Sequence, residues 1–175
     1  MVDTKKEQER EELHRAIWAI ADDLRGAVDG WDFKSYVLGT MFYRYISENI
    51  ASYINQGEID AGNPDFRYED MPDAEAEQAR EGLVQEKGFF ILPNELFCNV
   101  RAKAASDENL NETLETVFRH IEESAKGSSS EGQFAGLFDD YDVNSNKLGA
   151  TVAKRNEKLV KLLNGVADMN LGDVK

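Results

Sequence analysis

The stretch that decides the fold runs from residue 13 to residue 53 and reads LHRAIWAIADDLRGAVDGWDFKSYVLGTMFYRYISENIASY. In its second half, apolar side chains recur so that, at about 100° per residue, they cover roughly half of a helix circumference. They are Val37, Leu38, Met41, Phe42, Tyr45, Ile46, Ile50 and Tyr53, and opposite them fall Thr40, Arg44, Ser47 and Glu48. One neighbouring helix cannot cover so wide a face, so we predict a central helix over about residues 32–55, packed on at least two sides.

The first half of the same stretch supplies one of the neighbours. Its apolar residues recur at helical spacing and are Leu13, Ile17, Ile20 and Leu24. The turn-forming residues Gly26, Asp29 and Gly30 then interrupt the pattern. A helix over about residues 5–26, a short loop and the central helix together predict a long antiparallel helix hairpin.

The remaining chain is expected to dock on this hairpin as one helical domain spanning residues 1–175. Further core helices are predicted over about residues 109–125, where Leu114, Phe118 and Ile121 share a narrow face, and over about residues 148–165. Two glycines and two prolines mark residues 56–72 as a long acidic loop. At most one very short extended segment is expected, near Phe89–Leu92. The predicted fold class is therefore mainly α, a helical bundle.

The net charge limits the partners that this chain can have. The formal charge is −14, and nine acidic residues lie between Glu58 and Glu81 against only Arg67 and Arg80. Non-specific affinity for nucleic acid depends on clustered lysine and arginine. The composition therefore argues against a free-standing nucleic-acid binder, and the acidic region is interpreted as a solvated surface.

Cysteine usage and hydropathy indicate the compartment. Cys98 is the sole cysteine, so an internal disulfide is impossible and a reducing compartment is favoured. The first twelve residues are densely charged, unlike a secretory signal, and no apolar run reaches the length of a membrane span. We expect a cytoplasmic protein with no membrane partner.

Chemistry-bearing motifs are absent from the sequence. His14 and His120 have no partner at metal-ligand spacing, and no phosphate-binding loop, dinucleotide fingerprint or nucleophile elbow occurs. Asn63, Pro64, Asp65 and Phe66 partly match the Asn/Asp-Pro-Pro-aromatic tetrad of adenine methyltransferases, but the second proline is missing. A turn is the preferred interpretation of these four residues. No catalytic, metal-binding or cofactor-binding residue is assigned.

One cationic feature stands out in this acidic chain. Lys147, Lys154, Lys158 and Lys161 are predicted to fall together on the last helix, opposite an apolar face that includes Leu159 and Leu163. Two interpretations remain open for these lysines. They either form a solvated surface without a partner, or they contact phosphate or another acidic surface.

The order and spacing of the motifs resemble the amino-terminal helical domain of the modification (M, HsdM-type) subunit of type I restriction-modification systems. The first matching group is Leu13, Ile17, Trp18, Ala21, Asp22, Leu24, Arg25 and Gly26. The second is Phe33, Lys34, Val37, Leu38, Met41, Phe42, Arg44, Tyr45, Ile46 and Ser47. The segments FFILP at Phe89–Pro93, QFAGLF and NKLG continue the match, so the resemblance covers nearly the whole chain.

The resemblance implies a function that this chain would serve only as part of a larger protein. Members of the family transfer a methyl group from S-adenosylmethionine to N6 of an adenine flipped out of duplex DNA. They assemble with a specificity (S) subunit, a second M subunit and a restriction (R) subunit. The helical domain is associated with DNA clamping and subunit assembly, and the catalytic domain is expected after residue 175. On this hypothesis the chain is truncated, binds no cofactor and is inactive alone.

A second hypothesis comes from another class of protein. A mostly helical domain without its own active site could be an independent adapter or regulatory protein that binds a partner through the acidic loop or the lysines. The sequence that follows residue 175 in the gene would discriminate the two hypotheses.

Overall fold

A computed structural model describes residues 31–169. The helix expected at residues 5–26, and with it the predicted hairpin, lies outside these residues. Within them the regular elements are α2 (Trp31–Asp60), η1 (Tyr68–Asp70), α3 (Asp73–Ala76), η2 (Glu77–Ala79), α4 (Arg80–Lys87), η3 (Pro93–Glu95), α5 (Phe97–Ala104), α6 (Leu110–Ala125), α7 (Glu131–Phe134) and α8 (Val152–Ala167). All are helical and no strand occurs in residues 31–169, which confirms the mainly α fold class.

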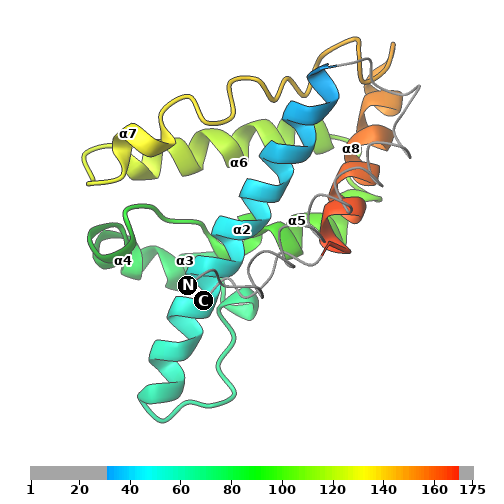
Figure 1. The fold of residues 1–175 in the computed structure, drawn as a ribbon. Coiled ribbons are helices and arrows are strands. Elements are labelled where there is room, and N and C mark those ends of the chain that lie inside the picture. Colours follow the sequence, from blue (N-terminus) through cyan, green and yellow to red (C-terminus); the bar gives the residue numbers. More distant parts are fainter. Residues whose placement is uncertain (1–30, 170–175) are drawn as a thin grey trace, which may run out of the picture.

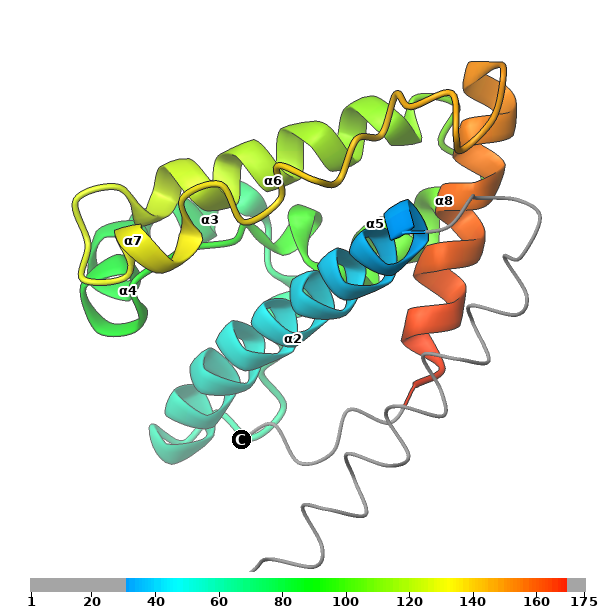
Figure 2. The same cartoon turned by 45° about the horizontal axis from the view of Figure 1, so that its top comes forward.

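The helices are arranged around α2, the longest of the elements that the structure describes. α8 and α5 pack against α2, and α6 packs against α8 (Figure 1). α2 and α6 both begin beside α8 and extend away from it (Figure 2), and the short helices α3, α4 and α7 lie toward the far end of α6. α8 therefore joins the two long core helices at one end of the domain.

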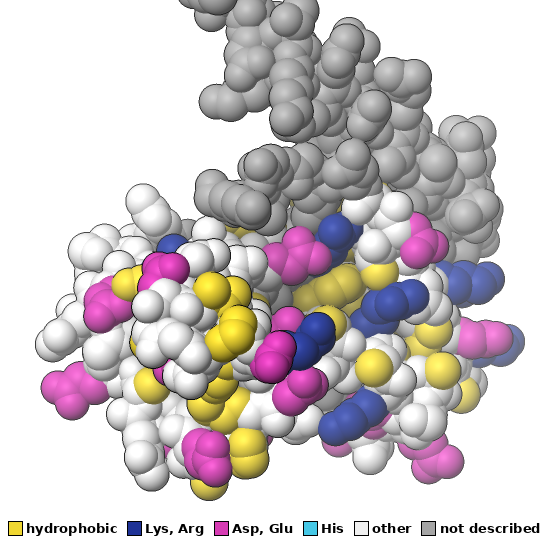
Figure 3. Space-filling model, turned by 90° about the horizontal axis from the view of Figure 1, so that it is seen from below, with side chains coloured by type: hydrophobic (Ala, Val, Ile, Leu, Met, Phe, Trp, Pro, Cys, Tyr) yellow, Lys and Arg dark blue, Asp and Glu magenta, His cyan; other side chains and the backbone are white. Residues whose placement is uncertain are grey.

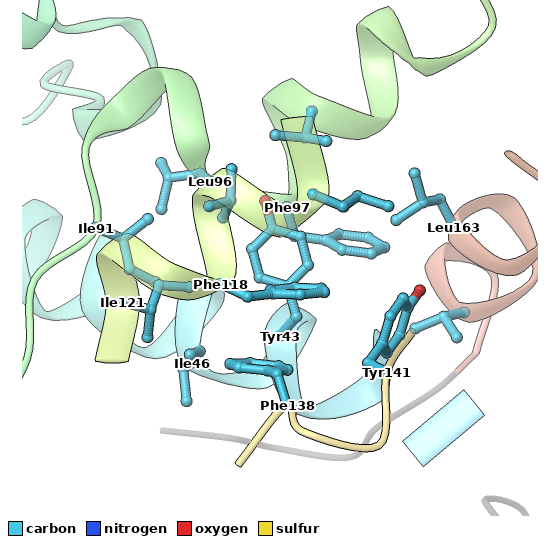
Figure 4. Close-up of a cluster of buried hydrophobic side chains, with 14 of the residues drawn as sticks. Tyr43, Ile46, Ile91, Leu96, Phe97, Phe118, Ile121, Phe138, Tyr141 and Leu163 are labelled. Atoms are coloured by element: carbon cyan, nitrogen blue, oxygen red, sulfur yellow. The ribbon is translucent and has the colours of Figure 1, made fainter. Parts of the chain in front are cut away.

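An aromatic cluster fills the space between α2, α6 and the segment after α7 (Figure 4). The Phe118 ring stacks on Phe138 at a centroid distance of 4.1 Å and meets Tyr43 and Tyr141 edge-on at 5.4 and 4.9 Å. All four side chains are buried. Gly39 permits the close approach of Tyr141, because a Cβ atom at Gly39 would lie 2.6 Å from the Tyr141 Cδ2 atom.

The face that α2 buries differs from the predicted one. Thr40 and Ser47, expected on the outer side, are 0% and 3% exposed, whereas Leu38 and Tyr45 are 46% and 41% exposed. Burial of the two hydroxyls is possible because each has a hydrogen-bond partner. Thr40 Oγ1 pairs with the Tyr141 hydroxyl at 2.8 Å, and Ser47 Oγ accepts a hydrogen bond from the backbone N–H of Phe97. Helical periodicity describes one segment at a time, so it cannot predict hydrogen-bond partners that lie so far away along the chain.

The predicted end of the central helix and start of the acidic loop are wrong by five residues. α2 continues through residues 56–60 to Asp60, since a single glycine such as Gly57 costs a helix only about 1 kcal/mol. The chain leaves the helix at Gly62, whose φ of 100° favours glycine. The tetrad that begins at Asn63 forms a turn, as predicted, in which the Phe66 N–H donates to the Asn63 carbonyl.

The short apolar segment before α5 is extended and buried, and it has no strand partner among the described residues. Phe89, Phe90 and Ile91 are each at most 5% exposed. Side chains satisfy its backbone groups instead: the Tyr68 hydroxyl donates to the Ile91 carbonyl, and Ser124 Oγ accepts from the Phe90 N–H. The expectation of a short extended segment that forms no sheet is therefore confirmed.

Candidate functional site

α8 presents three of the four predicted lysines on one face. Lys154, Lys158 and Lys161 follow one another at intervals of four and three residues, so their directions differ by at most about 60° around the helix. Lys154 and Lys161 are exposed, and Lys158 is partly buried. The residues that α8 buries are Asn156, Leu159, Leu162, Leu163 and Val166, and of these Leu162 lies next to Lys158 on the edge of the buried side. We call the three lysines the lysine face of α8.

Lys147 does not belong to this face, contrary to the prediction. The helix begins at Val152 rather than at residue 148, because Thr151 caps it with a side-chain oxygen that accepts a hydrogen bond from the Lys154 N–H. Lys147 lies in the turn before α8 and is exposed. Val152, the first residue of α8, is 45% exposed.

Removing the Thr151 cap is expected to weaken α8 locally. Thr151→Ala should lower the free energy of unfolding by about 1 kcal/mol, the usual cost of losing an N-cap side chain. Thr151→Ser should restore most of this loss, because serine supplies the same acceptor. Chemical denaturation of both variants measures the difference, and equal stability of Thr151→Ala and the unchanged protein would show that the cap contributes nothing.

A buried amide fixes the first half of α8 against the start of α6. Asn156 is 8% exposed, and its Oδ1 atom accepts a hydrogen bond from the Asn111 backbone N–H at 3.0 Å. Its Nδ2 atom donates to the Glu108 carbonyl at 2.9 Å. The neighbouring Arg155 donates to the Gly149 carbonyl and to Asn146 Oδ1. These contacts orient the lysine face rigidly relative to the core.

Arg44 of α2 fixes the other end of α8. Its Nη1 atom donates to the carbonyl oxygens of Val166 and Met169 at 2.8 and 2.5 Å, and its Nε atom donates to Glu48 at 2.8 Å. The last carbonyl groups of a helix lack partners within the helix and carry partial negative charge, so a cation is favourable there. The helical pattern placed Arg44 on the outer side of α2, but its side chain is only 15% exposed.

Arg101 of α5 adds a cation that the sequence analysis did not assign. Its Nε atom donates a hydrogen bond to Asn164 Oδ1 at 3.0 Å. Asn164 follows Lys161 by three residues in α8, so the Arg101 guanidinium lies near the lysine face. Lys and Arg side chains gather on the side of the molecule that holds α5 and α8, with some acidic side chains among them (Figure 3). Only the tertiary packing of α5 on α8 brings Arg101 to this surface.

The His120 imidazole forms a hydrogen bond with the Glu95 carboxyl group. Its Nδ1 atom lies 2.7 Å from Glu95 Oε2, and burial raises the pKa of the Glu95 carboxyl while the hydrogen bond with His120 opposes that rise. Within residues 31–169, no three His, Cys, Asp or Glu side chains are grouped so as to hold a metal ion. His14 lies outside these residues.

None of the helices that the structure describes has the length and apolar character of a membrane span.

The geometry defines, over the described residues, a helical domain with a lysine face on α8. Comparison with known families is in agreement: the model of the HsdM N-terminal domain matches residues 13–166, so this chain belongs to that family. The resemblance seen in the sequence is thereby confirmed.

Individual relatives support the same assignment. Over 180 residues and 98% of its length, the chain is 44% identical to the type I restriction enzyme MpnII methylase subunit of Mycoplasma pneumoniae, of which it covers 33%. It is also similar to the solved structure of a type I restriction-modification system methyltransferase subunit from Streptococcus thermophilus, with a TM-score of 0.74 and 27% identity over 93% of this chain and 35% of that one. The chain thus spans about a third of each relative, and the alternative of an independent adapter is not favoured.

Proposed function

We propose that this chain is the amino-terminal helical domain of a type I restriction-modification methyltransferase subunit that methylates adenine N6 in duplex DNA. The methyl donor would be S-adenosylmethionine, and the target base would be flipped out of the helix. The proposal rests on family membership and on two relatives named as methylase or methyltransferase subunits. Methyl transfer itself would be carried out by parts of the protein outside this domain.

The proposed role of this domain is to clamp DNA and to support assembly. The partners would be a specificity subunit, a second methyltransferase subunit, a restriction subunit and duplex DNA, all in the cytoplasm. A net charge of −14 makes independent DNA binding unfavourable, so contact with DNA would occur within the assembled complex.

The proposed contact with DNA is supported by the lysine face of α8. Three lysines are spread over about 10 Å of the helix, which rises 1.5 Å per residue, and they outnumber the exposed Glu157 that lies on the same side. Asn156 and Arg44 hold the two ends of this helix against the core, so the lysines are presented in a fixed direction. Such an arrangement suits contact with successive phosphate groups, which position a protein on DNA without reading its sequence.

The salt dependence of DNA binding tests this proposal in the assembled full-length complex. The triple variant Lys154→Ala, Lys158→Ala and Lys161→Ala is expected to weaken DNA binding and to reduce the slope of log K against log salt. The slope should fall by roughly 0.9 for each lost phosphate contact, hence by about 2 to 3 in total. Titration of labelled duplex DNA at several salt concentrations measures it.

A matched control removes the same number of positive charges elsewhere. Lys87, Arg119 and Lys126 lie on α4, on α6 and directly after α6. Their joint replacement by alanine should leave the salt slope within about 0.5 of its original value, because long-range effects between exposed charges are largely screened. An identical slope in both triple variants would assign the lysine face to ordinary solvated surface.

A further inference from the structure

Arg101, in the last turn of α5, is held at one of its nitrogen atoms while the other two are unused. The side chain is exposed, and its Nε atom donates a hydrogen bond to Asn164 Oδ1 at 3.0 Å. Within residues 31–169, neither Nη atom has a hydrogen-bond or ion-pair partner. Because the guanidinium group is planar and carries N–H donors on all three nitrogen atoms, fixing Nε leaves both Nη groups available to a ligand.

The other arginines that the structure describes are used differently. Arg44, Arg67, Arg80 and Arg155 each donate to carbonyl or carboxylate groups of the domain itself. Arg119 is exposed and unpaired, but no side chain fixes its guanidinium group. Among the arginines of residues 31–169, Arg101 alone combines a fixed orientation with unused donors.

Arg101 extends the lysine face of α8 onto a second helix. α5 packs on α8, and Asn164 lies one turn after Lys161 on the exposed side of α8. Two exposed acids, Glu157 and Asp168, lie within about one turn of these two residues, but neither forms an ion pair with Arg101. Because these acids offset part of the local positive charge, an anionic ligand would be held by the oriented guanidinium group rather than by general attraction.

We propose that Arg101 binds a phosphate group of duplex DNA through its two Nη groups, and that Asn164 is the positioning residue that holds the guanidinium group through Nε. This inference rests on the proposed function, since it needs DNA beside the lysine face. The planar fork of arginine matches the oxygen atoms of a phosphate group, which a lysine contacts only as a point charge. Orienting the fork before DNA arrives lowers the conformational entropy that binding would otherwise cost.

Three single substitutions in the assembled full-length complex test this role, with labelled duplex DNA of arbitrary sequence, because phosphate contacts do not read sequence. Arg101→Ala is expected to weaken binding about tenfold and to lower the slope of log K against log salt by roughly 0.9. Arg101→Lys should restore the slope, because the charge returns, but only part of the affinity. Asn164→Ala should weaken binding about threefold with the slope within about 0.3 of its original value, because the charge stays and only its orientation is lost.

Arg119→Ala is the matched control, because it removes one exposed arginine of α6 that no side chain orients. It should change the slope by less than about 0.3. An unchanged slope for Arg101→Ala, or an equal fall in both arginine variants, would overturn the inference. Unchanged affinity in Asn164→Ala would overturn the positioning role of Asn164.

The triple lysine variant described above distinguishes failure of this inference from failure of the proposed function. If that variant lowers the slope and Arg101→Ala does not, the lysine face still contacts DNA and only the role of Arg101 is wrong. If neither variant lowers the slope, both proposals are wrong. Sedimentation of each complex without DNA measures assembly, and loss of a subunit in Arg101→Ala would assign Arg101 to an acidic surface of that subunit and overturn the phosphate contact.

Discussion

Phe118→Ala is expected to lower the free energy of unfolding by about 3–5 kcal/mol, the range observed when a buried phenylalanine is replaced by alanine. The Phe118 ring contacts Phe138, Tyr43 and Tyr141, which come from α2 and from the segment after α7. Its removal would lose the transfer free energy of the ring, leave a cavity between the two elements and break three aromatic pairs. Urea denaturation followed by circular dichroism measures the change in midpoint at constant slope.

The adjacent residue gives the matched control for this prediction. Arg119 is exposed on α6, and Arg119→Ala should change stability by no more than about 0.5 kcal/mol. A loss below about 1.5 kcal/mol for Phe118→Ala would mean that the aromatic cluster collapses around the cavity without much cost. The cluster would then not be the main link between α2 and α6.

Arg44→Met is expected to lower the free energy of unfolding by about 2–4 kcal/mol. Methionine preserves much of the aliphatic stem but leaves the carbonyl groups of Val166 and Met169 without the donor that Arg44 supplies. Hydrogen bonds to charged groups contribute about 1.5–3 kcal/mol each. The Val166 carbonyl would still accept a hydrogen bond from the Met169 N–H, so the expected loss is smaller than the sum of two such bonds. Thermal or chemical denaturation gives the total loss, and native-state hydrogen exchange should show loss of protection concentrated in the last turn of α8.

Glu48→Gln separates the two contacts of Arg44. This substitution removes the ion pair with the Arg44 Nε atom but retains the hydrogen bonds to α8, and Glu48 is 41% exposed. Because exposed ion pairs contribute at most about 1 kcal/mol, Glu48→Gln should be much milder than Arg44→Met. Equal losses in the two variants would show that Arg44 acts through Glu48 and not as an anchor for α8.

Much of the fold could be predicted from the sequence because helical periodicity is a property of one segment at a time. Leu114, Phe118 and Ile121 were predicted to share one face of a helix, and all three are buried on α6. Three of the four predicted lysines likewise share one face of α8. Helix ends were harder, since Gly57 was interpreted as a break while Thr151 was not recognised as a cap.

The residues that fix the candidate site could not be found in this way. Asn156 contacts Asn111 of α6, more than forty positions earlier in the chain, and Arg44 contacts carbonyl groups more than a hundred and twenty positions later. Both side chains are polar, so a search for apolar periodicity assigns them to the surface. The one signal for Arg44 in the sequence was its place among the residues that match the family resemblance.

The sequence by itself determined that this chain is helical, which faces of α6 and α8 are apolar, and to which family it belongs. Only the tertiary structure decided which side of α2 is buried, where α2 ends and α8 begins, and which polar groups hold α8 in place. The physical reason is that a buried Thr40, Ser47 or Arg44 is stable only when a distant segment supplies its hydrogen-bond partner. The packing of the whole domain determines which segment supplies this hydrogen-bond partner, and the local pattern of apolar residues does not indicate it.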